Sequence, residues 1–228
     1  MQAKTVEISK GLTGFLAAPD VQSSTAIVLI QEIFGVNAYI RSLAKEYAGM
    51  GYTVLAPDLF WRSAAGIELD ASRAEDREQA MQLNAQYNDD DGMQDLRNAI
   101  AYLRQAMPTA TKIGAIGYCL GGRLAYKLGK ENMVDAAVAY YGVNIQKFPG
   151  DPNTMSPTLI HIAGSDHLCP PEAQQEIVDT YKGASRVHVD IHKEAGHGFA
   201  RPGSQHYSES ATSQANARTT AFLQENLK

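Results

Sequence analysis

The sequence predicts an α/β fold, with a mostly parallel, doubly wound β-sheet flanked by helices. Short apolar runs alternate along the whole chain with segments of helical periodicity, which is typical of parallel strands joined by helices. Several runs contain no polar residue, as in Ala26–Ile30, and such runs are expected of strands buried on both faces. The length of 228 residues suits one medium domain, so we expect a single domain over residues 1–228.

The amino-terminal half is expected to contain four strands and three helices. The first two strands are weak and read as a hairpin around Gly11. The first and third helices have apolar residues three and four positions apart, whereas the second is polar. Gly51 ends the first helix, and Pro57 ends the fourth strand. The expected strands are residues 6–8, 14–17, 26–30 and 52–56, and the expected helices are residues 40–47, 72–87 and 93–107.

The carboxy-terminal half continues the same alternation. Its first three strands are mostly apolar, and the last strand alternates apolar and polar residues. Chemistry in such sheets lies at the carboxyl ends of strands, so the residues that directly follow each strand are the candidates for a site. The expected strands are residues 113–118, 134–141, 158–163 and 187–191, and the expected helices are residues 120–128, 174–181 and 208–227.

The composition narrows the classes of function. Lys and Arg number 20 against 25 Asp and Glu, a net charge of −5 without a basic cluster, so no nucleic-acid partner is expected. No apolar run approaches the roughly 20 residues of a membrane helix, and no signal segment is visible. We therefore expect a cytoplasmic monomer or small homo-oligomer that needs no membrane. Cys119 and Cys169 are too few for a disulfide framework or a Cys-rich zinc site, so we expect no metal and no other cofactor.

The segment from Gly117 to Gly121 has the pattern of a nucleophile elbow with Cys119 at its centre. It joins a strand to a helix, and the close passage of the two requires small residues two positions before and after the nucleophile. Such a turn projects the side chain at the edge of the sheet, where the helix amino terminus favours a thiolate. The alternative is a buried structural cysteine beside packing glycines.

A base and an acid follow later strands. His197 is flanked by glycines after strand 187–191, and Asp166 follows strand 158–163. The order Cys119, Asp166, His197 is nucleophile, acid, base, the triad order of α/β-hydrolases. Taken singly, His197 could be an ordinary loop residue and Asp166 a helix cap or turn residue.

An oxyanion hole would use the amide of Leu120, the residue after the nucleophile. Its second donor would be Ile33, in the loop after strand 26–30. Glu32 is unusual there, because a carboxylate opposes an anionic intermediate. Either Glu32 caps the next helix, or it acts with the thiol.

Seven stretches occur in an order that is highly specific for one enzyme family. They are residues 31–37, 57–59, 77–80, 117–122, 140–143, 164–167 and 194–201. Over nearly the whole chain the sequence resembles the dienelactone hydrolase (carboxymethylenebutenolidase) family, of the α/β-hydrolase superfamily. The resemblance implies a single-domain α/β-hydrolase fold in which the three residues above form the triad.

The resemblance also implies roles for three charged residues. Glu32 looks like the glutamate that partners the thiol and accepts its proton when substrate binds. Arg201 looks like the resting partner of that glutamate and a contact of the substrate carboxylate. Arg77 looks like the second arginine for the same carboxylate, a group that guanidiniums suit in geometry and charge. Without the resemblance, Arg77 would be read as a surface residue of a polar helix.

Three positions depart from the family pattern in the expected substrate site. Characterised members carry Tyr and Trp where this sequence has Met81 and Asn84, and often Ser where it has Gly198. The implied function is hydrolysis of a small anionic ester or lactone, with conversion of dienelactone to maleylacetate as the first candidate. The alternatives are another ester or lactone of this kind, or an inactive binding module, whose sign would be a broken triad.

Overall fold

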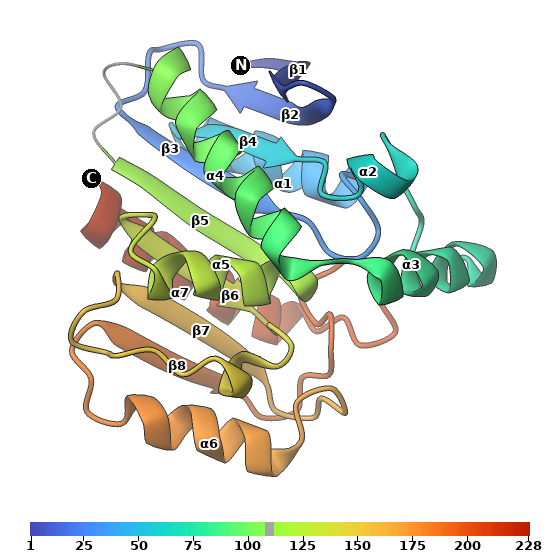
Figure 1. The fold of residues 1–228 in the computed structure, drawn as a ribbon. Helices are drawn as coiled ribbons and strands as arrows, with labels where there is room; N and C mark the ends of the chain where they lie inside the picture. The colour runs from blue at the N-terminus through green and yellow to red at the C-terminus, as the bar shows by residue number, and fades with distance from the viewer. Residues whose placement is uncertain (108–111) are drawn as a thin grey trace. The chain divides into compact units, whose positions relative to one another are not determined.

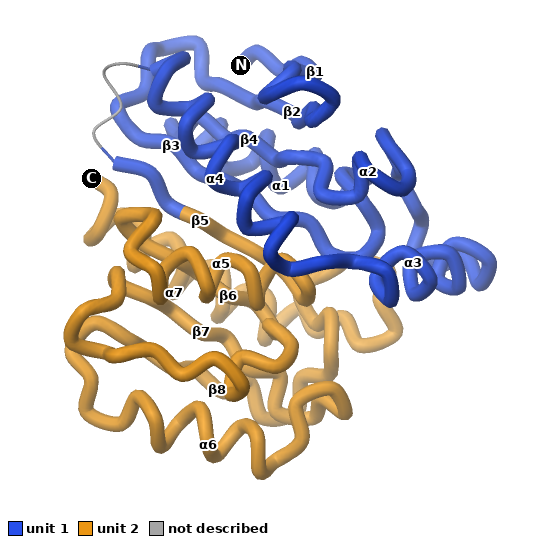
Figure 2. Tube along the Cα trace, viewed as in Figure 1, with its two compact units in different colours: residues 1–114 blue, residues 115–228 orange. Residues whose placement is uncertain are grey.

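The computed structural model describes residues 1–107 and 112–228 and has the predicted α/β architecture (Figure 1). Its eight strands form a mostly parallel sheet that helices flank. Contacts along the chain define two compact units, residues 1–114 and residues 115–228, which Figure 2 shows in blue and orange. Each unit is described separately below.

Unit 1 contains four strands in the order β1-β2-β4-β3. The pairs β1–β2 and β2–β4 are antiparallel, and β3–β4 is parallel. Figure 1 shows α4 in front of these strands and α1 behind them. The elements are β1 (Gln2–Ser9), β2 (Leu12–Ala18), β3 (Thr25–Ile30), α1 (Ala38–Gly49), β4 (Thr53–Pro57), α2 (Trp61–Ala64), α3 (Ala74–Gln86) and α4 (Asp89–Ala106).

The helix boundaries of unit 1 follow from side-chain caps. The side chain of Asn37 accepts from the amide of Ile40 at the start of α1. The side chain of Asn88 accepts from the amides of Asp90 and Asp91 at the start of α4, whose first turn holds three aspartates. These carboxylates complement the helix dipole. The four residues of α2 were not predicted, because one helical turn is too short to show a period.

Unit 2 holds the end of β5 and all later elements, in the strand order β5-β6-β7-β8. The pairs β6–β7 and β7–β8 are parallel. Figure 1 shows α5 in front of these strands and α7 behind them. The elements are β5 (Lys112–Tyr118), α5 (Leu120–Lys130), β6 (Ala136–Tyr140), η1 (Ile145–Lys147), β7 (Thr158–Ala163), α6 (Pro171–Tyr181), β8 (Val187–His192) and α7 (Glu209–Leu227).

Strand register brings the carboxyl ends of unit 2 to one edge. Tyr140 pairs with His161 in β6–β7, and Ala163 pairs with His192 in β7–β8. The loops that follow these strands therefore open on the same side. The predicted strand 134–141 is too long at its end, because Tyr141 has a φ of 38° and leaves the extended conformation.

Candidate active site

The turn between β5 and α5 has the geometry of a nucleophile elbow. Cys119 adopts φ 55° and ψ −114°, a conformation rare for a residue with a side chain. Its amide donates to the carbonyl of Tyr140, at 3.0 Å. A Cβ at Gly117 would lie 1.9 Å from the carbonyl oxygen of Gly121, so only glycine fits at position 117.

The thiol of Cys119 is less accessible than the sequence suggested. Elbow turns were expected to project the nucleophile at the sheet edge, yet only 8% of Cys119 is exposed.

Asp166 and His197 form a tight hydrogen-bonded pair. His197 Nδ1 lies 2.6 Å from Asp166 Oδ2, and the side chains are 14% and 1% exposed. Asp166 Oδ1 accepts from the amide of Leu168 at 2.8 Å. The Asp166 side chain therefore serves both as a turn residue, through Leu168, and as the partner of His197. These are the two interpretations that the sequence left open.

The charge state of His197 depends on Cys119 and Asp166. Burial lowers its pKa, but the charge of Cys119, the hydrogen bond that His197 donates to Asp166 and further interaction with both groups outweigh burial and raise the pKa to about 10. The imidazolium is therefore favoured when Cys119 is a thiolate. The structure thus brings Cys119, Asp166 and His197 together from the ends of three strands.

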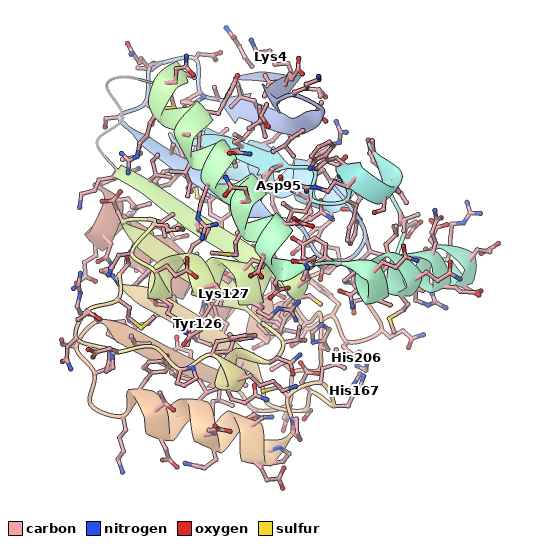
Figure 3. The ribbon with its side chains drawn as sticks, in the orientation of Figure 1. Lys4, Asp95, Tyr126, Lys127, His167 and His206 are labelled. Carbon is pink, nitrogen blue, oxygen red and sulfur yellow. The ribbon has the colours of Figure 1, made fainter. Side chains whose placement is uncertain are left out.

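The other histidines differ in their exposure to solvent. His161 lies inside β7 and is fully buried, whereas His167 and His206 are exposed. Figure 3 labels the two exposed side chains at the surface of unit 2. The buried ring of His161 hydrogen-bonds to His192 at 3.2 Å and to Thr219 at 3.0 Å. The rings of His161 and His192 are therefore bonded to each other rather than to the triad.

Glu32 and Ile33 occupy the loop after β3 in unit 1. Glu32 is 2% exposed, and the cap of α1 is Asn37, so the helix-capping interpretation of Glu32 is wrong. Gln31 fixes this loop, because its Oε1 accepts from the amide of Leu59 at 3.1 Å and its Nε2 donates to the carbonyl of Glu32 at 3.2 Å. A buried carboxylate on a fixed loop favours the functional interpretation over the capping one.

Arg77, Met81 and Asn84 are all exposed residues of α3. Their spacing places them on one face of the helix, and Ala80, the buried residue of α3, adjoins that face. Arg77 Nη1 donates to the carbonyls of Ala71 and Ser72, at 3.0 Å and 2.8 Å. These bonds hold the guanidinium against the start of its own helix.

Arg201 and Gly198 share the loop of the candidate base in unit 2. The amide of Arg201 donates to the carbonyl of Gly198 at 3.1 Å. Gly198 has a φ of +77°, and a Cβ there would lie 3.3 Å from Nη2 of Arg201. The guanidinium therefore lies directly over Gly198, one residue from His197.

Two aromatic residues beside His197 were missed in the sequence. The ring of Tyr141 lies 5.2 Å from that of His197 at 66°, and 5.3 Å from that of Phe199 at 71°. The sequence prediction placed Tyr141 inside the strand 134–141. In the structure Tyr141 directly follows β6, and a position directly after a strand was the signal that could have identified it. Phe199 follows His197 by two residues but has no pattern of its own.

Neither a metal cluster nor a membrane helix is apparent in the described parts of the chain. Residues 1–107 and 112–228 hold no group of three His, Cys, Asp or Glu side chains that could bind a metal ion. Across the same residues, no helix has the length and apolar character to cross a membrane.

Comparisons with known proteins identify the family to which the chain is similar. The sequence profile of the dienelactone hydrolase family matches residues 12–227. The chain is 38% identical over 209 residues to a carboxymethylenebutenolidase of Pseudomonas putida, covering 91% of this chain and 89% of the relative. It is 35% identical over 211 residues to carboxymethylenebutenolidase 1 of Cupriavidus pinatubonensis, covering 92% and 89%.

Solved structures show the same fold. A putative dienelactone hydrolase from Klebsiella pneumoniae superposes with a TM-score of 0.83 at 23% identity, covering 98% of both chains. A dienelactone hydrolase-like promiscuous phosphotriesterase from metagenomic libraries superposes with a TM-score of 0.76 at 20% identity, covering 100% and 99%. The predicted fold class is confirmed.

Proposed function

Since the chain belongs to the dienelactone hydrolase family and is a hydrolase of ester or lactone bonds, we propose that it converts dienelactone to maleylacetate through an acyl-enzyme on Cys119. The observation that carries the proposal is the pairing of His197 with Asp166 at 2.6 Å beside a cysteine on a strained elbow. A nucleophile, a base and an orienting acid in this relation suit acyl transfer.

In the first step the Cys119 thiolate attacks the lactone carbonyl. The oxyanion forms next to the first turn of α5, where Leu120 provides its amide and the helix dipole favours negative charge. Ile33 provides the second amide. The ring oxygen leaves as an enolate that conjugation delocalises, so this step needs little help from an acid.

In the second step water hydrolyses the acyl-enzyme. His197 Nε2 accepts a proton from the water as the oxygen attacks the thioester carbonyl. Asp166 holds Nδ1–H, so the tautomer and the orientation of the imidazole are suited to a base. Collapse of the intermediate returns the Cys119 thiolate and leaves one proton of the water on His197. The carboxylic acid that forms releases the other proton, and the enolate takes up a proton to give the ketone of maleylacetate.

Binding of the substrate carboxylate is assigned to two arginines. Arg201 lies over Gly198 beside the base, and Arg77 is held at one end by the carbonyls of its own helix start. The guanidinium of Arg77 is held through Nη1, so its other N–H groups can bind a carboxylate. Local arginines are required because the chain as a whole carries a net charge of −5. In this proposal Glu32 accepts the thiol proton in those molecules whose Cys119 is still protonated when the substrate arrives.

The proposal is tested by comparing dienelactone with a neutral nitrophenyl ester. Arg77→Ala is expected to lower kcat/KM for dienelactone by about tenfold or more, as for loss of a charge-assisted contact, and to leave the neutral ester within about twofold. Arg73→Ala, on the same helix, is the matched control. Equal turnover of both substrates by the wild type, with no effect of Arg77→Ala, would show that dienelactone is not the substrate.

A second candidate is another small anionic ester or lactone. Met81 is 61% exposed and Asn84 is exposed, and neither supplies the aromatic surface that the family pattern has at these positions. A panel of lactones with and without a carboxylate separates the candidates. The proposal places the enzyme in the cytoplasm, as a monomer or small homo-oligomer. Sedimentation equilibrium tests the oligomeric state.

A further inference from the structure

Tyr141 is held in a costly backbone conformation directly beside the candidate base. It has a φ of 38°, it is 2% exposed, and its amide donates to the carbonyl of His161 at 2.8 Å. Large aromatic residues rarely adopt positive φ, and such residues cluster at functional sites. The strain persists because the bond to β7 and the packing of the ring both require this conformation.

The surroundings of Tyr141 explain the direction of its side chain. A Cβ at the next residue, Gly142, would lie 2.9 Å from the amide nitrogen of Arg123, so the chain turns closely against α5. The turn directs the Tyr141 ring toward His197 and Phe199. Phe199 is fully buried, and its ring lies 4.9 Å from that of His192. The aromatic contact with His197 therefore has a rigid support.

His197 needs such a contact, because its bond to Asp166 constrains only one ring atom. An imidazole held at Nδ1 alone can still rotate about the line that joins Nδ1 to Oδ2. Rotation moves Nε2 away from both Cys119 and the attacking water. Catalytic groups must be held within about 0.5 Å and 10–20° of the productive geometry, so a second contact is required.

We infer that Tyr141 is a positioning residue whose ring fixes the plane of the His197 imidazole. The ring supplies the lateral contact that the Asp166 bond does not provide. The inference rests on the proposed roles of Cys119 and His197. The charged and titratable groups that act directly on His197 in the described structure are Asp166 after β7 and Cys119 at the elbow.

The test measures how the rate of Cys119 alkylation by iodoacetamide depends on pH, which needs no substrate. In Tyr141→Leu the imidazole rotates more freely and stabilises the thiolate less. The pH at which the alkylation rate is half its maximum, the alkylation midpoint, is therefore expected to rise by about 0.5 pH unit. With the best substrate, kcat is expected to fall about tenfold with little change in KM. Tyr141→Phe keeps the ring and is expected to match the wild type in both measurements.

Tyr181→Leu is the matched control. Tyr181 is also a buried tyrosine of unit 2, at 4% exposure, and its ring packs on that of Tyr126. This variant is expected to lose thermal stability without a change in the alkylation midpoint. If Tyr141→Leu does not fold, Tyr141→Met retains more of the side-chain volume and takes its place.

The outcomes separate the inference from the function on which it rests. A midpoint in Tyr141→Leu equal to that of the wild type, or a loss in Tyr141→Phe as large as in Tyr141→Leu, overturns the positioning role of the ring. Activity that survives complete alkylation of Cys119 in the wild type overturns the thiol mechanism instead.

Discussion

Cys119 and Cys169 differ in chemistry although both are free and nearly buried. Cys119 lies on the elbow beside His197, whose imidazolium favours a thiolate. Cys169 follows Asp166, and its amide donates to the carbonyl of that residue at 3.1 Å. Burial and then the charge of Asp166 raise the pKa of Cys169 to about 11. Only Cys119 is therefore expected to react at neutral pH.

Alkylation at pH 7.5 should label one cysteine and abolish activity. Mass spectrometry is expected to find the label on Cys119, with Cys169 unmodified in the folded protein because its thiol stays protonated. Cys169→Ser should retain activity within about twofold. Label on Cys169 at a comparable rate would contradict the difference in environment.

The elbow should not tolerate a methyl group at position 117. Gly117→Ala is expected to abolish activity and to lower the free energy of unfolding by about 3 kcal/mol, because its Cβ would overlap the carbonyl of Gly121. Gly49→Ala in α1, where nothing lies within 4 Å of the added carbon, is the control. Its free energy of unfolding should rise by about 0.5 kcal/mol. Calorimetry measures both.

At the scale of elements, a buried carboxylate joins α2 to α4 in unit 1. Asp95 on α4, labelled in Figure 3, is 1% exposed. Its Oδ2 accepts from Trp61 Nε1 at 3.0 Å and from Arg62 Nη1 at 2.5 Å, and its Oδ1 accepts from Arg62 Nη2 at 3.0 Å. The fork of Arg62 also lies over the Trp61 ring. These contacts hold a helix of four residues that has no side-chain cap.

Asp95→Asn should weaken this connection and lower the free energy of unfolding by about 2 kcal/mol, because charge-assisted bonds are lost at a buried site. The exposed pair Arg73–Asp76, at 3.9 Å, is the comparison. Arg73→Ala should cost about 0.5 kcal/mol or less. Urea unfolding measures both variants, and equal losses would show that burial of Asp95 adds nothing.

At the scale of the whole molecule, stability should depend on the buried histidine of β7. His161 Nε2 bonds to Thr219 Oγ1 of α7, and that hydroxyl also lies 2.7 Å from Tyr140 Oη of β6. Nδ1 of His161 bonds to His192 of β8. Burial, then the charges of His192 and Arg218, hold the pKa of His161 well below its ordinary value of 6.5.

The free energy of unfolding should therefore fall as the pH drops below 6.5, the ordinary pKa of histidine. Below that pH the unfolded chain binds a proton that folded His161 does not, at a cost of up to about 1.4 kcal/mol per pH unit. Above pH 6.5 His161 is unprotonated in both states, so its full contribution to the free energy of unfolding is present. His161→Gln should be less stable at pH 8 but show a flatter decline between pH 6.5 and 5, measured by chemical denaturation. His206→Gln, at an exposed position, should parallel the wild type.

The sequence by itself determined the order of strands and helices and the residues at the ends of the strands. Apolar runs, three-to-four spacing and glycines around Cys119 are local signals, so they can be read without knowledge of distant contacts. The same reasoning placed Asp166 and His197 after strands. The family resemblance added Arg77, Arg201 and a reason for Glu32.

Only the tertiary structure decided how these residues are held. It assigned the cap of α1 to Asn37 rather than Glu32, and it brought His197 to 2.6 Å from Asp166. It also placed the Tyr141 ring beside His197 by turning the chain out of β6. These features depend on contacts between residues far apart in the chain, which no periodicity records. A positive φ at a tyrosine is stable only where such contacts outweigh its local cost.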